Sequence, residues 1–194
     1  MDESTEKRII AFTSQSLKQC GIRAVRMNDI AKHMNVSKRT LYEVYVTKEN
    51  LISNCLMTYK DRTENMFRII RYECPDAIGN LWAIAKAYID NLYKANNVFW
   101  FDVSQSPEYK FIYDSYNRIW SNELEAVIQT CKKEGYIIYN LNSATFIECF
   151  TTLLYISRVR ECFPALLLNS AYYMIRGIIT EAGTELFNQI QLEE

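Results

Sequence analysis

Hydrophobic residues recur at helical spacing along almost the whole chain, and this pattern predicts an all-α fold of about nine helices. The three prolines fall at junctions between the expected helices, where the first turn of a helix tolerates proline. With only 5 glycines and 3 prolines, the sequence disfavours a β fold with many tight turns. The expected helices cover residues 5–20, 28–34, 38–45, 47–72, 76–95, 98–104, 107–134, 143–162 and 166–191.

Residues 28–45 form two short predicted helices joined by a tight turn. Asn28 is expected to cap the first helix and Ser37 the second, because both side chains can accept a hydrogen bond from a free backbone N–H. Asn35 tolerates the left-handed conformation that the turn requires. The small side chain of Ala31 lets the two helices cross closely. Together these features indicate a helix-turn-helix.

The charge of the chain is unevenly distributed. Residues 1–60 contain 10 Lys and Arg against 6 Asp and Glu, whereas residues 61–194 carry a net charge of −5. A small basic region attached to an acidic body is typical of a DNA-binding module fused to a domain of another kind. We therefore expect a DNA-binding head over residues 1–47 and a larger helical domain over residues 48–194.

The outward side chains of the second helix of the motif are nearly all hydrogen-bond formers. We expect Arg39 and Thr40 to read bases, because Arg pairs with guanine through two hydrogen bonds and Thr can bond to a base or touch a thymine methyl. Lys38, Tyr42 and Lys48 are better placed to hold phosphates. The full predicted DNA-binding set is Arg26, Asn28, Ser37, Lys38, Arg39, Thr40, Tyr42 and Lys48.

Five short stretches follow a known pattern: Gly21, Met27-Asn28-Asp29-Ile30-Ala31, Asn35-Val36-Ser37, Lys38-Arg39-Thr40-Leu41-Tyr42 and Lys48-Glu49-Asn50-Leu51. On these residues the sequence resembles the TetR family of bacterial regulators over residues 6–55. The resemblance implies a three-helix DNA-binding head on an all-α domain that binds a ligand and forms a homodimer. It also implies a transcriptional repressor that a small molecule releases from a pseudo-palindromic operator.

Two positions depart from the family pattern. Arg26 stands where the family often has Ser or Thr, and an Arg there is expected to hold a phosphate more strongly. Val44 occupies a place that usually carries Tyr or His, so we expect it to be a core residue and the family's second aromatic phosphate contact to be missing.

The larger domain is rich in aromatic residues. We expect most of them to form the core and a subset to line a ligand pocket, namely Trp82, Tyr88, Trp100, Tyr113, Tyr116 and Trp120. By the resemblance, the helices at 143–162 and 166–191 would pair with their copies across a two-fold axis. Their many apolar positions are compatible with this pairing, and Gly177 and Gly183 would allow close approach.

The sequence argues against an enzyme. His33 is the only histidine and lies inside the helix-turn-helix, and there is no glycine-rich phosphate loop. The six cysteines form no C-x-x-C pair, so we expect reduced thiols and neither a metal site nor a cofactor. Without a signal peptide or a long apolar stretch, a cytoplasmic protein is expected. Two alternatives remain open: a helix-turn-helix regulator that senses redox through cysteine, and a helical adaptor that binds protein.

Overall fold

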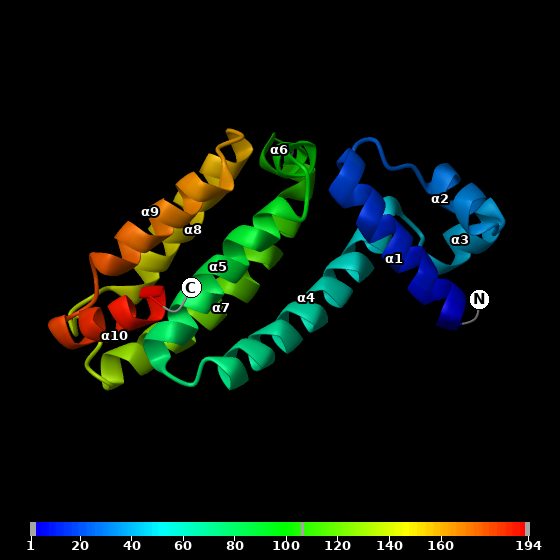
Figure 1. Cartoon of the computed structure of the whole chain (residues 1–194). Coiled ribbons are helices and arrows are strands. Elements are labelled where there is room, and N and C mark those ends of the chain that lie inside the picture. Colours follow the sequence, from blue (N-terminus) through cyan, green and yellow to red (C-terminus); the bar gives the residue numbers. More distant parts are fainter. Residues whose placement is uncertain (1–2, 106, 193–194) are drawn as a thin grey trace. The chain divides into compact units, whose positions relative to one another are not determined.

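The structure, a computed structural model, describes residues 3–105 and 107–192. Within these ranges it contains no strand, and helices make up 81% of the residues. Figure 1 shows their arrangement. None of these helices is both long and apolar enough to cross a membrane. The ten α-helices, one more than expected, and one 3-10 turn are α1 (Glu3–Cys20), α2 (Met27–Met34), α3 (Lys38–Val44), α4 (Lys48–Glu73), α5 (Ala77–Tyr93), α6 (Asn97–Gln105), η1 (Pro107–Tyr109), α7 (Lys110–Lys133), α8 (Ser143–Val159), α9 (Pro164–Arg176) and α10 (Glu181–Leu192).

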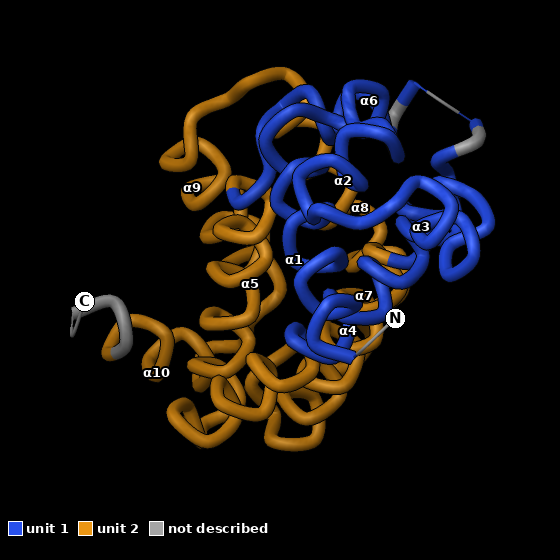
Figure 2. Tube along the Cα trace, turned by 90° about the vertical axis from the view of Figure 1, so that its right-hand side faces the viewer, with its two compact units in different colours: residues 1–63, 94–115 blue, residues 64–93, 116–194 orange. Residues whose placement is uncertain are grey.

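The chain divides into two compact units, coloured separately in Figure 2. Unit 1 contains residues 1–63 and 94–115, and unit 2 contains residues 64–93 and 116–194. The head that we expected at residues 1–47 therefore packs as part of a larger unit, which extends into α4 and also includes α6, η1 and the start of α7.

Unit 1 has one hydrophobic core. Ile9 and Leu17 of α1 pack with Leu41 of α3, and Val103 and Ile112 from the 94–115 segment belong to the same buried cluster. Burial of these side chains fixes α1, α2 and α3 against each other, since each buried aliphatic side chain contributes roughly 1.5–3 kcal/mol. The 94–115 segment is thus part of the scaffold that holds the helix-turn-helix.

Unit 2 is organised around α5, which packs against α8, α9 and α10. Most of the side chains of α5 are buried, as its near-continuous apolar sequence requires. α8 and α9 also pack against each other and run side by side in Figure 1. The largest fully buried side chains of this unit are aromatic: Trp120, Tyr88, Phe150 and Phe187.

The prediction of a single helix over residues 166–191 is wrong, because this part of the chain forms two helices, α9 and α10. Between these helices, Ile179 forms an isolated antiparallel bridge with Ile137. The N–H of Thr180 donates to the carbonyl of Tyr136 at 2.9 Å. Gly183, in the first turn of α10, lies so close to the Tyr136 carbonyl oxygen that an added Cβ would clash with it. The close approach that Gly183 permits is therefore to the backbone of Tyr136 in the same chain.

Candidate nucleic-acid interface

The turn between α2 and α3 has the expected geometry. Asn35 is left-handed, with φ 56° and ψ 39°, and the N–H of Val36 donates to the carbonyl of Ala31 at 3.0 Å. Ala31 and Leu41 are buried in the core of unit 1, and the partly buried Val44 packs against that core. Ala31, predicted to let the helices cross closely, and Val44, predicted to be a core residue, therefore both face inward.

The start of α2 differs from the prediction for Asn28. The extended N-cap residue is Arg26, whose carbonyl accepts the N–H of Asp29 at 3.0 Å and of Ile30 at 3.2 Å. Asn28 consequently lies inside the first turn, with its side chain exposed, and does not cap the helix. The helix starts earlier because the buried Met27 anchors its first turn to the core.

The N-cap predicted for α3 is confirmed. The N–H of Thr40 donates to the Ser37 hydroxyl oxygen at 2.9 Å. The two hydroxyl groups also share a hydrogen bond of 2.7 Å. Ser37 therefore satisfies one of the free N–H groups of a helix only seven residues long.

The exposed side chains of α3 are paired along the helix. Lys38 Nζ lies 5.7 Å from the centre of the Tyr42 ring, within the range of a cation–π contact. The Arg39 Nε–H donates to Glu43 Oε1 at 2.8 Å. With the Ser37 and Thr40 pair, these contacts link the predicted DNA-binding side chains of α3 to neighbours along its outward face.

Lys48 lies at the start of α4 and is only partly exposed. Its Nζ donates to the carbonyl oxygen of Ile22 at 2.5 Å, so the ammonium group is engaged with the loop between α1 and α2. Arg26, in the same loop, is exposed. The structure thus brings Arg26 and Lys48 to the same loop region, and their contacts with phosphate remain predictions.

Contacts from α6, which no sequence pattern predicted, hold the loop between α1 and α2. The buried carboxylate of Asp102 accepts the backbone N–H of Ile22 at 2.8 Å and of Arg23 at 3.1 Å. The N–H of Asn96 donates to the carbonyl of Lys18 at 2.8 Å, which satisfies the C-terminal end of α1. These partners lie about 80 residues apart in sequence, beyond the reach of any local pattern.

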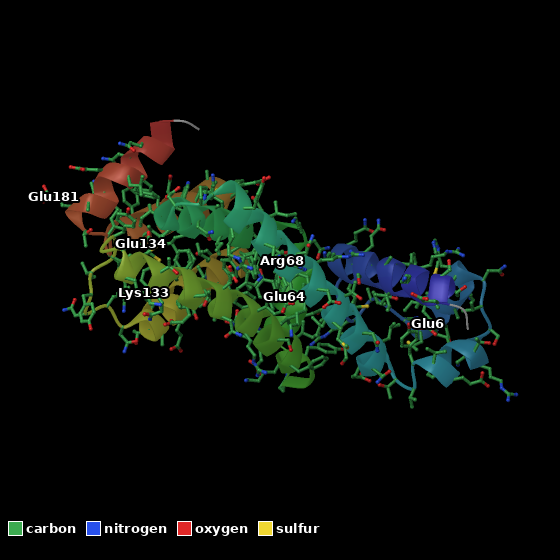
Figure 3. All side chains as sticks on the ribbon, turned by 90° about the horizontal axis from the view of Figure 1, so that it is seen from below. Glu6, Glu64, Arg68, Lys133, Glu134 and Glu181 are labelled. Atoms are coloured by element: carbon green, nitrogen blue, oxygen red, sulfur yellow. The ribbon has the colours of Figure 1, made fainter. Side chains whose placement is uncertain are left out.

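Tyr45 closes the inner side of the motif. Its hydroxyl pKa is raised, first by burial and then by the carboxylate of Glu6 on α1, which Figure 3 labels, and by Cys55. The phenol is therefore neutral at physiological pH, and Tyr45 is a core residue of the head.

A second group of predicted residues forms an aromatic cluster in unit 2. Tyr88 lies 5.2 Å from Trp120 and 5.8 Å from Tyr116, measured between ring centres. Phe67 of α4 meets Trp120 edge-on at 5.0 Å. The Tyr88 hydroxyl donates to the carbonyl of Thr151 on α8 at 3.2 Å. Four helices, α4, α5, α7 and α8, therefore contribute to this cluster.

The other three predicted pocket residues lie elsewhere. Trp82 contacts Phe187 of α10 at 5.6 Å and Tyr172 of α9 at 6.3 Å. Trp100 and Tyr113 belong to unit 1. The structure therefore joins Tyr88, Tyr116 and Trp120 into one cluster and places Trp82, Trp100 and Tyr113 in other surroundings.

The six cysteines are free thiols in different environments. Burial raises the pKa of Cys131 to about 12, with smaller contributions from the Glu134 and Asp76 carboxylates. Burial likewise raises the pKa of Cys55. Cys20 and Cys149 are exposed. The described residues contain no group of three or more His, Cys, Asp or Glu side chains that could hold a metal ion.

Comparison with known proteins connects this geometry to a family. Residues 9–55, which contain the whole helix-turn-helix, match the sequence model of bacterial regulatory proteins of the tetR family. No curated protein is similar enough in sequence to match the chain.

Several solved structures share the fold. A candidate transcriptional regulator from Saccharomonospora viridis in complex with choline is 15% identical, with a TM-score of 0.76 over 93% of this chain and 100% of that one. A TetR transcription regulator from Haloarcula marismortui is 13% identical, with a TM-score of 0.76 over 92% and 100%. The reduced form of E. coli NemR is 14% identical, with a TM-score of 0.75 over 92% and 98%. Residues 9–55 are thus similar to the helix-turn-helix region of bacterial regulatory proteins of the tetR family, and the chain shares the fold of these solved regulators.

Proposed function

We propose that the chain is a homodimeric repressor whose two α3 helices bind a pseudo-palindromic operator, and that a small-molecule effector releases it from DNA. The observation that carries the proposal is the outward face of α3, where Lys38, Arg39, Thr40 and Tyr42 are held by paired contacts. Arg39 and Thr40 would read bases. The phosphate contacts would come from Lys38, Tyr42, Lys48 and Arg26, with Asn28 and Ser37 alongside.

The dimer is supported by an apolar surface on α8 and α9. Leu153 and Ile156 are exposed on α8, and Leu166 and Tyr173 on α9. Neighbouring exposed apolar side chains on two packed helices favour a protein interface. A two-fold dimer would present two α3 helices to two inverted half-sites.

The effector site is proposed at the cluster of Tyr88, Tyr116 and Trp120. The buried amide oxygen of Asn117, which follows Tyr116 on α7, has no hydrogen-bond donor among the described residues. A polar group of a ligand could satisfy this oxygen while aromatic rings bury the apolar part. Because Tyr88 and Trp120 are fully buried, a ligand would have to move these rings.

The helix α4 offers a route from that cluster to the head. It carries Phe67, which contacts Trp120, and at its first residue Lys48, which holds the Ile22 carbonyl. A ligand that displaces Phe67 would shift α4 and change the distance between the two recognition helices. This mechanism requires the ligand to bind the free and DNA-bound arrangements with different affinities.

A salt titration of DNA binding tests the proposal. We expect the protein to bind a labelled random duplex at low salt and to lose affinity steeply as salt rises, because phosphate contacts release counterions. Lys38→Ala should reduce the slope of this dependence by about one. Lys133→Ala, at the end of α7 (Figure 3), is the control and should leave the slope unchanged. A protein-binding adaptor would show no such binding.

The proposed release from DNA by an effector is tested separately. Choline, bound by the regulator from Saccharomonospora viridis, is the first probe for binding to free and DNA-bound protein. A ligand from a wider panel that binds both forms with equal affinity would rule out release by that ligand. Trp120→Leu is expected to abolish release from DNA by any ligand that binds at the cluster of Tyr88, Tyr116 and Trp120.

A further inference from the structure

We propose that Glu43 is a specificity-determining residue, which positions Arg39 so that its terminal amino groups read one base of the operator. This inference rests on the proposed function, in which Arg39 contacts a base. It adds a residue outside the DNA-binding set predicted from the sequence, and it assigns to Glu43 a role that acts through Arg39.

The position of the pair on α3 is the first support. Leu41 is fully buried and marks the inner side of the helix. At about 100° per residue, Arg39 and Glu43 both fall within about 20° of the point opposite Leu41. Lys38 and Tyr42 lie to one side and Thr40 to the other. The Arg39 and Glu43 pair therefore occupies the centre of the face that would enter the major groove.

The geometry of the contact is the second support. Glu43 Oε1 accepts the Nε–H of Arg39 at 2.8 Å. Guanine O6 and N7 accept two parallel N–H groups of an Arg side chain. A carboxylate that accepts the Nε–H orients the rigid guanidinium plane along the helix face. The terminal amino groups take no part in this hydrogen bond and can donate to a base. Glu43 thus orients the group that would pair with guanine.

Charge gives the third support. The side chain of Arg39 is 89% exposed and that of Glu43 is 58% exposed, so the pair is only weakly coupled in free protein. A carboxylate at the centre of a DNA-binding face is repelled by phosphates, and the neighbouring Arg39 offsets only part of this repulsion. Once DNA excludes water from the pair, the attraction strengthens. Glu43 therefore lowers attraction to DNA of any sequence while it orients Arg39 toward one base.

The experiment begins with duplexes that the wild-type protein selects from a randomised library. Affinities for the selected duplex, for single-base variants and for random DNA are then measured for wild type, Arg39→Ala, Glu43→Ala, Glu43→Gln and the double variant. Both side chains are exposed, so these substitutions are expected to leave the fold intact, and circular dichroism checks this.

We expect Arg39→Ala to lose preference at one base pair. In Glu43→Ala, the ratio of the affinities for the selected duplex and for the variant at that same base pair should fall about threefold to tenfold. This variant should also bind random DNA more tightly at low salt. Glu43→Gln should also bind random DNA more tightly but keep most of the preference, because the amide retains an acceptor oxygen. The double variant should lose no more preference than Arg39→Ala alone.

Three results would overturn the inference. If Arg39→Ala loses the preference and Glu43→Ala keeps it, Glu43 has no positioning role, although the proposed function stands. If Glu43→Ala changes preference in the Arg39→Ala background, Glu43 reads a base itself. If Arg39→Ala keeps every preference, the base-reading role of Arg39 in the proposed function fails, and the inference fails with it.

Discussion

The carboxylate of Asp102 on α6 accepts the backbone N–H of Ile22 at 2.8 Å, which joins α6 to the loop that leads into the helix-turn-helix. The same carboxylate oxygen accepts the N–H of Arg23. Because the loop precedes α2, its conformation fixes where the DNA-binding motif begins. Asp102 is therefore a structural residue of the head although it lies far from the motif in sequence.

Removal of this carboxylate should destabilise the protein. Asp102→Ala leaves two N–H groups of the loop without their acceptor, so we expect the free energy of unfolding to fall by roughly 1–3 kcal/mol. Urea unfolding followed by circular dichroism measures the change. Asp114→Ala is the matched control, because Asp114 forms an exposed pair with Lys110 at 2.9 Å, and its loss should lower the free energy of unfolding by less than about 0.5 kcal/mol. Equal losses in the two variants would contradict the role given to Asp102.

Two glycines with positive φ allow the cost of backbone strain to be measured separately from the cost of a steric clash. Gly21 has φ +82°, and an added Cβ would lie 2.7 Å from Val98 Cγ1 and 2.8 Å from Asp102 Oδ2. Gly135 has φ +78° with nothing within 4 Å of an added Cβ. Gly135→Ala should therefore cost about 1–2 kcal/mol from the left-handed backbone alone, whereas Gly21→Ala should cost more, because Val98 and Asp102 must also move. Thermal unfolding compares them, and a larger loss for Gly135→Ala would show that the α6 contact is not tight.

The dimer surface makes a prediction about oligomeric state. Tyr173→Asp places a charge among the exposed apolar side chains of α8 and α9, so we expect it to convert the dimer to a monomer. Light scattering after size-exclusion chromatography measures the mass. Tyr139→Asp changes a tyrosine that is even more exposed and lies outside these helices, and this variant should remain dimeric. If the wild-type protein is a monomer at micromolar concentration, the proposed dimer is wrong.

Thiol reactivity separates effector release from redox sensing. With a pKa of about 12, Cys131 is almost entirely protonated at pH 8, and the raised pKa of Cys55 acts in the same direction. Since the thiolate is the reactive form, both should resist iodoacetamide until the protein unfolds. Cys20 and Cys149 are exposed and should react first in the folded protein. Mass spectrometry after timed labelling identifies the modified residues. A redox-sensing regulator would lose DNA binding on oxidation, and Cys20→Ser or Cys149→Ser would prevent that loss.

The helix-turn-helix could be predicted from sequence because its signals are local. Asn35 adopts the left-handed conformation that its position in the turn indicated, and the Ser37 side chain caps α3 by accepting the N–H of Thr40, three residues on. The break between α9 and α10 could not be predicted, because it depends on a bridge between Ile137 and Ile179, which lie in distant parts of the sequence. The same reason explains why the contacts of Asp102 were missed.

The aromatic residues show a related limit. Their composition indicated a large buried aromatic core, and three of the six predicted pocket residues, Tyr88, Tyr116 and Trp120, form one cluster. Helical periodicity predicts which face of a helix is buried, but it does not predict which other helix covers that face. Trp82 therefore packs against Phe187 and Tyr172 from helices that follow it by many residues.

Selection of bound duplexes from a randomised DNA library tests the central claim most directly. If two α3 helices of a dimer read DNA, the selected sequences should contain two inverted half-sites with a fixed spacing, and Arg39→Ala should lose the preference at symmetric positions in both. Selection of no consensus, or of a single site without inverted symmetry, would contradict the account.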